Sequence, residues 1–148
     1  MLKRFLLLAL LLPIFLYAKS EFSNPKPSFD NPRKWVVPIK TDDIHIINHT
    51  IGAINNVINQ YPPESINIAM VFYSSGMRVI KKDYDKKTLK RLQSLVDGYD
   101  VEIIGCINTM QTMKWTKKDF IDGVTYRQAG VVEVIEREVD GWFVFAPY

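Results

Sequence analysis

The chain has 148 residues, of which 47% are hydrophobic and 24% charged, and its formal net charge is +3. This length and apolar content fit one domain with a sizeable core, and they exclude an intrinsically disordered chain. A single cysteine, Cys106, excludes a disulfide-rich scaffold. The small positive excess gives no reason to expect a nucleic-acid partner, and the sequence contains no motif of a nucleic-acid-binding fold.

The first residues have the pattern of a secretory signal. Lys3 and Arg4 precede an apolar run from Phe5 to Leu16, and charge returns directly after Ala18. Such a run is short for a membrane span but suits the central region of a signal peptide. We therefore expect residues 1–18 to be removed on export, leaving a periplasmic protein without stable membrane insertion. An uncleaved membrane anchor is the alternative.

Residues 19–33 are rich in proline and polar side chains, which predicts an extended tether without regular structure. The segment 34–148 then alternates apolar runs of strand length with helical periodicity. Strands are expected at 35–39, 66–72, 101–106 and 142–145. Helices are expected from Asp42 and Asp43 to about 60, at 85–96, 108–114 and 128–139, with a short turn near 117–120. Pro38 weakens the first strand because proline cannot donate to a sheet ladder.

This order of elements predicts a three-layer α/β domain, with a mainly parallel sheet of about five strands flanked by helices. Ligands of such domains gather at the carboxyl ends of the strands. Cys106 ends the third strand, and Ser74, Ser75 and Gly76 follow the second. Those three residues could present backbone N–H groups to an anion or small ligand, although a plain turn is the simpler interpretation.

Cys106 is expected just before a helix. Asn108 is a good N-cap residue, and Gln111 three positions later completes a variant of the capping box. The free N–H groups and dipole of a helix N-terminus favour an anion, and a thiolate is one.

The neighbours of Cys106 could support such a thiolate. Lys114, Lys117 and Lys118 would add positive potential, and Gly105 would leave space for a small group bound on sulfur. The alternative is a buried cysteine that acts as a small hydrophobic side chain.

The stretch Val101–Met110 resembles the Cys-x-Asn-Thr segment of DsrE/DsrF-like proteins, here Cys106, Asn108 and Thr109. Residues 129–135 and 140–142 are similar to the closing helix and last strand of that family, and 68–76 to its second strand and glycine loop.

The resemblance implies a compact α/β fold that assembles into homo-oligomers, often trimers or hexamers. In sulfur-relay members, typically cytoplasmic, a cysteine at the end of the third strand carries persulfide sulfur between partner proteins, and Cys106 matches it. The predicted function is therefore to bind or relay sulfane sulfur on Cys106, in contact with a sulfur donor or acceptor protein. If the chain is an enzyme, it transfers sulfur. The alternative is a non-catalytic, oligomeric ligand-binding or scaffold protein.

The expected site comprises Cys106, Ser74, Ser75, Gly76, Gly105, Asn108 and Thr109, and no cofactor or metal is expected. His45 and His49 have a spacing that can bind a metal ion, but helical geometry puts them opposite the isoleucine stripe of their helix. That stripe consists of Ile44, Ile47, Ile51, Ile54 and Ile58.

Aromatic residues are concentrated in the last third of the chain: Trp115, Phe120, Trp142, Phe143, Phe145 and Tyr148. Because large aromatics are enriched at interfaces, they predict a homo-oligomer with Met110–Phe120 near a subunit boundary. Alternatively, they fill the monomer's own core.

Overall fold

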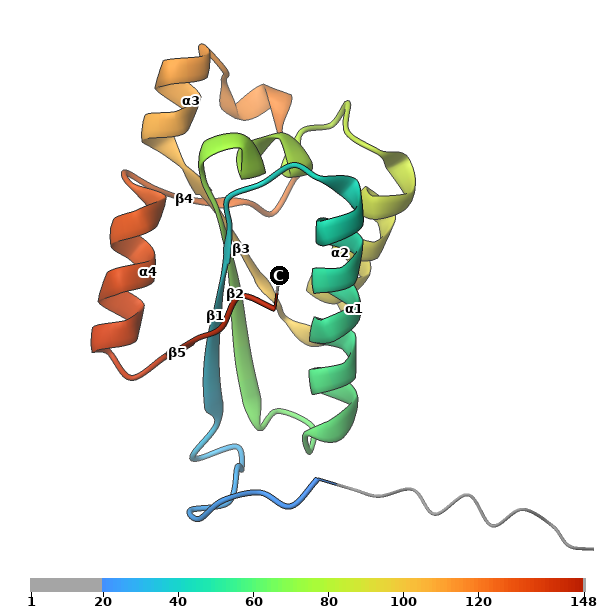
Figure 1. Ribbon diagram of the computed structural model, residues 1–148, viewed down its shortest axis with the longest axis vertical. Coiled ribbons are helices and arrows are strands. Elements are labelled where there is room, and N and C mark those ends of the chain that lie inside the picture. The colour runs from blue at the N-terminus through green and yellow to red at the C-terminus, as the bar shows by residue number, and fades with distance from the viewer. Residues whose placement is uncertain (1–19, 148) are drawn as a thin grey trace, which may run out of the picture.

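A five-stranded, all-parallel sheet lies at the centre of the structure, a computed structural model that describes residues 20–147 (Figure 1). The predicted signal peptide, residues 1–18, lies outside the described residues. The strand order is β4-β3-β2-β1-β5. The strands are β1 (Arg33–Ile39), β2 (Ile66–Phe72), β3 (Glu102–Cys106), β4 (Thr125–Arg127) and β5 (Phe143–Val144). The helices are α1 (Ile44–Gln60), α2 (Lys86–Tyr99), α3 (Ile107–Met113) and α4 (Gly130–Val139), with 3-10 segments η1 (Ser74–Ile80) and η2 (Lys117–Asp119).

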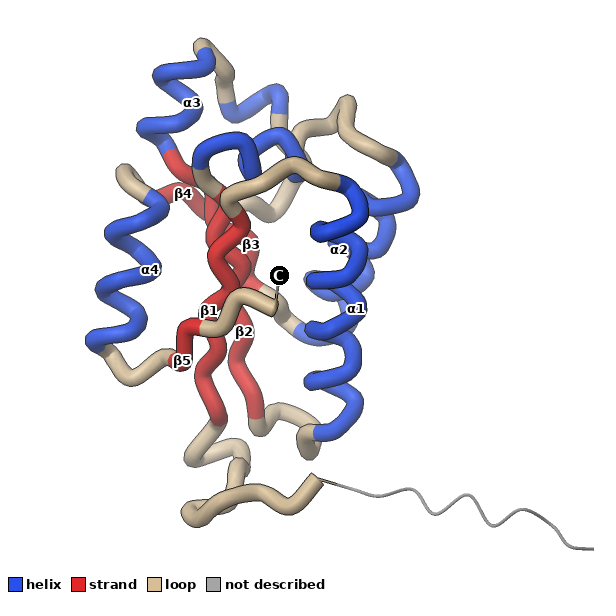
Figure 2. Tube along the Cα trace, viewed as in Figure 1, coloured by secondary structure: helices blue, strands red, loops and turns tan. Residues whose placement is uncertain are grey.

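The predicted three-layer α/β architecture is confirmed. Helices α1 and α2 cover one face of the sheet and α4 covers the other, as Figure 2 shows. Val37, Met70 and Ile103 point into the larger core under α1 and α2. The residues between them on each strand point to the α4 side. The smaller core there consists of Val36, Ala69, Val71, Ile104 and Val134. Burial on both faces explains why these strands are almost continuously apolar.

Pro38 does not interrupt β1, because its missing donor faces away from β2. Residues of a parallel strand direct their backbone groups to alternate neighbours. The Val36 carbonyl accepts the Phe145 N–H on the outer side of β1 (3.5 Å), so Pro38, two residues on, also faces that side. Because Pro38 has no N–H to donate on that side, the Phe145 carbonyl accepts a hydrogen bond from the indole N–H of Trp35, with Nε1 and O 3.1 Å apart. All seven residues of β1 therefore pair with β2.

Aspartates begin the two helices of the larger layer, as expected. Asp43 accepts hydrogen bonds from backbone N–H groups in the first turn of α1 (2.8 and 3.1 Å), and Asp85 caps α2 in the same way. Helix α2 runs beyond its predicted end at Val96. It includes Gly98 and stops at Asp100, whose φ of 53° is left-handed. One glycine near a helix end was not enough to stop a helix that packs along the sheet.

Residues 125–127 form a strand, β4, which the sequence did not indicate. They pair with the end of β3 from Ile104 to Cys106. Three residues are too few to show a period-two pattern. Helix α4 consequently begins at Gly130, two residues later than predicted.

The segment 20–32 forms no named helix or strand, yet it lies against the domain. The Arg33 guanidinium donates hydrogen bonds to the carbonyls of Ser23 (2.9 Å) and Pro25 (2.8 Å). The ring of Phe22 packs on Tyr61, with centroids 4.8 Å apart. Among residues 20–147, no helix is long and apolar enough to cross a membrane.

The aromatic residues of the last third are divided between the core and the surface. Phe120 is fully buried, and Trp115 packs against the larger core, so the middle of the Met110–Phe120 segment contributes to the monomer. Phe143 and Phe145 are exposed, with their rings stacked 6.2 Å apart. Tyr148 lies outside the described residues.

Candidate functional site

A cleft of about 480 Å³ lies at the carboxyl edge of the sheet, where β2 and β3 end. Three segments line it: the chain after β2, the junction of β3 with α3, and the start of α4. The lining residues are Tyr73, Ser74, Ser75, Arg78, Cys106, Asn108, Thr109, Thr112, Met113, Ala129, Gly130 and Val131. The cleft is therefore assembled from positions far apart in the sequence.

The structure brings most of the predicted site residues together. Ser74, Ser75, Cys106, Asn108 and Thr109 all line this cleft. Ser74 and Ser75 open the 3-10 segment η1, where a turn was the simpler expectation.

The two predicted glycines do not line the cleft. A Cβ on Gly76 would approach the Ile39 carbonyl oxygen to 2.1 Å, so this position packs η1 on the end of β1. A Cβ on Gly105 would meet the Tyr126 ring at 3.1 Å. The expectation that Gly105 leaves space for a group on sulfur is therefore wrong, because that space is taken by a neighbouring ring.

Cys106 is itself the N-cap residue of α3, which corrects the predicted cap at Asn108. The chain turns from β3 into the helix without an intervening residue, so Asn108 and Gln111 do not form the expected capping box. Instead, the Asn108 N–H donates to the Gln128 carbonyl (3.0 Å), and its side-chain oxygen accepts from Gln128 Nε2 (2.6 Å). These bonds join the start of α3 to the segment before α4.

The surroundings of Cys106 lower the pKa of its thiol. Burial alone raises this pKa, because it penalises the thiolate. Hydrogen bonding from the Thr109 hydroxyl and from the backbone N–H groups of Gly130, Thr109 and Asn108 outweighs burial and holds the pKa below its ordinary value. When protonated, the thiol donates to the Gln128 carbonyl, with Sγ and O 3.8 Å apart. The site therefore favours the nucleophilic form of the sulfur.

The Thr109 hydroxyl is oriented by the loop after β2. The Ser74 N–H donates to Thr109 Oγ1 (3.0 Å), which occupies a lone pair and leaves the hydroxyl proton available for Cys106. Ser74 makes this contact from a left-handed conformation, with φ of 53°. Ser74 thus acts on the sulfur indirectly, by orienting the hydroxyl of Thr109.

Gly130 is a site residue that the sequence did not single out. A Cβ here would lie 2.8 Å from Tyr73 Cβ and 3.3 Å from Cys106 Cβ. A glycine therefore allows the first turn of α4 to approach the sulfur closely enough for its N–H to interact. The available signal was a glycine at a helix start, where the preference for glycine is only modest.

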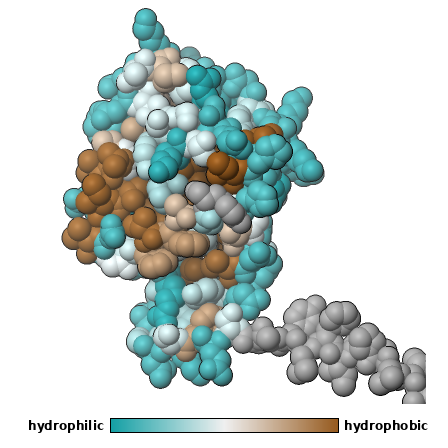
Figure 3. Space-filling view, in the orientation of Figure 1, coloured by the Kyte–Doolittle hydropathy of each residue, from teal (hydrophilic) through white to brown (hydrophobic). Residues whose placement is uncertain are grey.

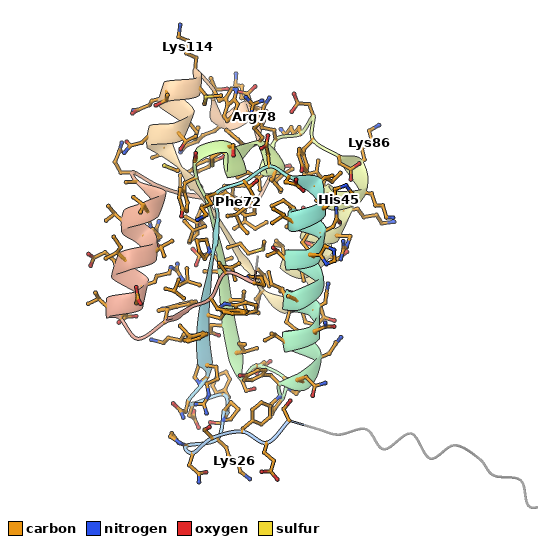
Figure 4. The ribbon with its side chains drawn as sticks, in the orientation of Figure 1. Lys26, His45, Phe72, Arg78, Lys86 and Lys114 are labelled. Carbon is orange, nitrogen blue, oxygen red and sulfur yellow. The ribbon has the colours of Figure 1, made fainter. Side chains whose placement is uncertain are left out.

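The lysines expected near the thiol do not line the cleft. Lys114 adopts a left-handed conformation that ends α3, and its side chain projects outward from the tip of the helix (Figure 4). Lys117 lies over the Tyr126 ring, 4.9 Å from its centroid. Arg78 is the charged residue at the rim, and it pairs with Asp42 at 3.6 Å. Hydrogen bonds, and not lysine charges, therefore stabilise the thiolate.

His45 and His49 lie on the exposed side of α1, as their spacing from the isoleucine stripe indicated. Across residues 20–147, no three His, Cys, Asp or Glu side chains are grouped so that they could hold a metal ion.

Fold and site together define an α/β protein with one cysteine thiol, of lowered pKa, at the carboxyl edge of a parallel sheet. The structure is similar to that of MTH1491 from Methanobacterium thermoautotrophicum, a protein of unknown function, with a TM-score of 0.71 and 25% sequence identity. The match covers 78% of this chain and 99% of that one. No family model matches the chain, and a search of curated proteins finds no match. The similarity thus supports the fold.

Proposed function

We propose that this protein is an exported, periplasmic member of the DsrE/DsrF-like proteins, in which Cys106 binds or relays sulfane sulfur as a persulfide. One observation carries the proposal: donors from α3 and α4 converge on a single thiol and lower its pKa. A structural cysteine needs no such donors. A thiolate that accepts sulfur needs them, because the thiolate is the attacking species.

The reaction is a redox-neutral exchange. The Cys106 thiolate attacks the terminal sulfur of a donor persulfide, the donor's S–S bond breaks, and the donor leaves as a thiolate that takes up a proton. Cys106 then carries the terminal sulfur as a persulfide. An acceptor thiolate attacks that sulfur, and Cys106 is released as a thiolate. The N–H groups of Gly130 and Thr109 stabilise the anion at the start and end of this cycle.

The walls of the cleft suit a sulfur species better than a polar metabolite. Met113, Val131 and Ala129 provide apolar surface beside the sulfur. Burial raises the pKa of Tyr73, so its phenol stays neutral at physiological pH. A persulfide sulfur is large and polarisable, and it is well accommodated by such walls.

A second candidate function is non-catalytic ligand binding or scaffolding, with Cys106 structural. Its support is the low exposure of Cys106, at 4%. The Cys106 N–H also donates to the buried thioether of Met77, at 3.3 Å. In this case the cleft would hold a small ligand without covalent chemistry.

Alkylation of the folded protein with iodoacetamide across a pH series separates the two functions. The proposal expects labelling of Cys106 to reach half its maximal rate below the ordinary thiol pKa of about 8.5. It also expects inorganic polysulfide to add the mass of a sulfur atom, reversed by a small thiol. Cys106→Ser is the control for both readouts. Slow labelling at every pH below 8.5 would exclude the sulfur relay and leave the second candidate.

Export and assembly belong to the same proposal. Intact mass of the protein recovered from the periplasmic fraction is expected to lack the first 18 residues. The same sample is expected to behave as a homo-oligomer, a trimer or hexamer by the resemblance. A full-length chain held in the membrane fraction would contradict export.

A further inference from the structure

One permanent charge lies in the cleft around Cys106. Of the twelve described residues that line the cleft, Arg78 alone is always charged, and it comes from η1. Tyr73 stays neutral because burial raises its pKa, and apart from Cys106 the remaining lining residues do not ionise. Cys106 itself is only 4% exposed. A ligand that reaches the sulfur through this cleft therefore meets one fixed positive charge.

Arg78 is held in place without using its hydrogen-bond donors. Its guanidinium lies over the Trp115 ring, 5.5 Å from the centroid, and that ring packs against the larger core. The partner carboxylate of Asp42 is 3.6 Å from Nε, which is too long for a hydrogen bond, and both side chains are nearly half exposed. In the described part of the chain the guanidinium donates no hydrogen bond. An anion in the cleft therefore competes with one weak, solvent-screened pair.

The two sides of the cleft differ in polarity. Ala129 and Val131 form an apolar wall at the start of α4. The lining residues from η1 are polar or charged, and they are Ser74, Ser75 and Arg78. Figure 3 shows hydrophobic side chains gathered over α4 and mostly pale or hydrophilic ones above them, and Figure 4 places Arg78 at that upper end of the molecule. The cleft therefore suits a molecule with a polarisable group at one end and an anionic group at the other.

We propose that the sulfur donor of Cys106 is a low-molecular-weight persulfide with a carboxylate, and that Arg78 binds this carboxylate. The inference rests on the proposed sulfur transfer and names its substrate class. A small donor fits because the cleft has a volume of about 480 Å³, within the usual range of small-molecule sites, and contains a nearly buried sulfur. A carboxylate fits because a guanidinium binds it through two parallel N–H···O bonds.

Sulfur transfer from such a donor needs no oxidant or reductant. The Cys106 thiolate attacks the terminal sulfur of the donor, a new S–S bond forms, and the donor's own S–S bond breaks. The electron pair of that bond leaves with the donor as a thiolate, which takes up a proton. The carboxylate brings a negative charge towards an anionic nucleophile, and the positive charge of Arg78 offsets this repulsion.

Two alkylating reagents of similar size separate charge recognition from the reactivity of the thiol. Iodoacetate is anionic and iodoacetamide is neutral, so the ratio of their rates on Cys106 cancels the fraction of thiolate. Arg78→Gln is expected to lower the ratio of iodoacetate to iodoacetamide about fivefold, the effect of one charge contact in water. Asp42→Asn is expected to raise the ratio, because it removes the competing carboxylate.

The matched control for Arg78→Gln is Lys81→Gln. Lys81 lies over the same Trp115 ring, with Nζ 5.2 Å from its centroid, but it does not line the cleft. Lys81→Gln is therefore expected to leave the ratio unchanged. A ratio in Arg78→Gln equal to that of the wild type, or an equal fall in both variants, would overturn the proposal.

Sulfur transfer itself is measured with two donors of similar length, the persulfides of 3-mercaptopropionate, which carries a carboxylate, and of 2-mercaptoethanol, which is neutral. Mass spectrometry follows the gain of one sulfur atom on Cys106, with Cys106→Ser as the control. The wild type is expected to reach its half-maximal rate at a lower concentration of the carboxylate donor, and Arg78→Gln is expected to lose this preference. Equal use of both donors by the wild type would overturn the donor class and leave sulfur transfer standing, whereas absence of transfer from both would refute the proposed function as well.

Discussion

At the scale of single residues, the character of the site depends on which groups point at one sulfur. The Thr109 hydroxyl makes two interactions. Its oxygen accepts a hydrogen bond from the Ser74 N–H at 3.0 Å, and its proton is donated to Cys106, which lowers the pKa of the thiol. Thr112 lies one turn further along α3 and lines the same cleft, but its hydroxyl donates to the Asn108 carbonyl at 3.0 Å. The two threonines therefore allow one effect to be measured against a close control.

Thr109→Val is expected to raise the pKa of Cys106, because it removes a donor that stabilises the thiolate. With less thiolate at neutral pH, iodoacetamide alkylation should slow by about tenfold at pH 7, the effect of one lost hydrogen bond to a charged group. Thr112→Val should leave the rate unchanged. Equal slowing of both variants would show that cleft shape, and not the Thr109 hydroxyl, controls the sulfur.

Two glycines give opposite expectations for the same substitution. Gly130→Ala should lower the free energy of unfolding by about 1–3 kcal/mol, because the new methyl group overlaps Tyr73 and pushes α4 outward. Gly98→Ala, in α2 with open space around it, should raise the free energy of unfolding by up to about 1 kcal/mol. Urea denaturation measures both. Destabilisation by Gly98→Ala, or none by Gly130→Ala, would contradict this account.

At the scale of elements, the long periodic segments were predictable and the short ones were not. The expected bounds of β2 and the far end of α1 match the structure, because each carries a long, consistent apolar pattern. Strand β4 has only three residues, and α3 begins directly after the last residue of β3. Neither feature can be recognised from the local sequence, since both depend on pairing and packing with distant segments.

Helix α4 is held on the sheet by an ion-pair group whose members, Arg137, Glu133 and Glu102, are partly buried. Arg137→Leu should reduce the free energy of unfolding by about 1.5–3 kcal/mol, because it leaves the Glu102 carboxylate without its charged partner, whereas Glu133 keeps Arg127. The exposed pair of Lys34 and Asp140, at 3.4 Å, provides the comparison, and Lys34→Ala should change stability by less than about 0.5 kcal/mol. If the two variants lost similar amounts of unfolding free energy, the burial of an ion pair would not determine its contribution to stability in this protein.

At the scale of the whole molecule, the sequence located one half of the site. Cys106 and Ser74 could be placed at the carboxyl edge because they follow apolar strands. Gln128 and Gly130 could not, since they reach Cys106 only after the chain has crossed through β4 and returned on the far side of the sheet. The pKa of Cys106 depends in part on that return. The sequence predicted the contribution of the N–H groups at the start of α3, but it missed Gly130 and added lysines that do not line the cleft.

The docked segment before β1 gives a prediction for the molecule as a whole. Arg33→Ala removes the hydrogen bonds to Ser23 and Pro25, and it should release the segment while the domain stays folded. Cleavage after the exposed Phe29 by chymotrypsin should accelerate, and far-UV circular dichroism should not change. A rate equal to that of the wild type would indicate that other contacts hold the segment.

The position of Pro38 has a consequence for the behaviour of the protein at high concentration. An open sheet presents unpaired backbone groups at its edge, and another strand can add there and begin aggregation. Beyond Val36 the outer side of β1 is such an edge, but Pro38 offers no N–H, and the Phe145 carbonyl is already engaged by Trp35. A foreign strand therefore finds no continuous row of partners. The residue that weakened the prediction of a strand protects the folded protein against aggregation through that edge.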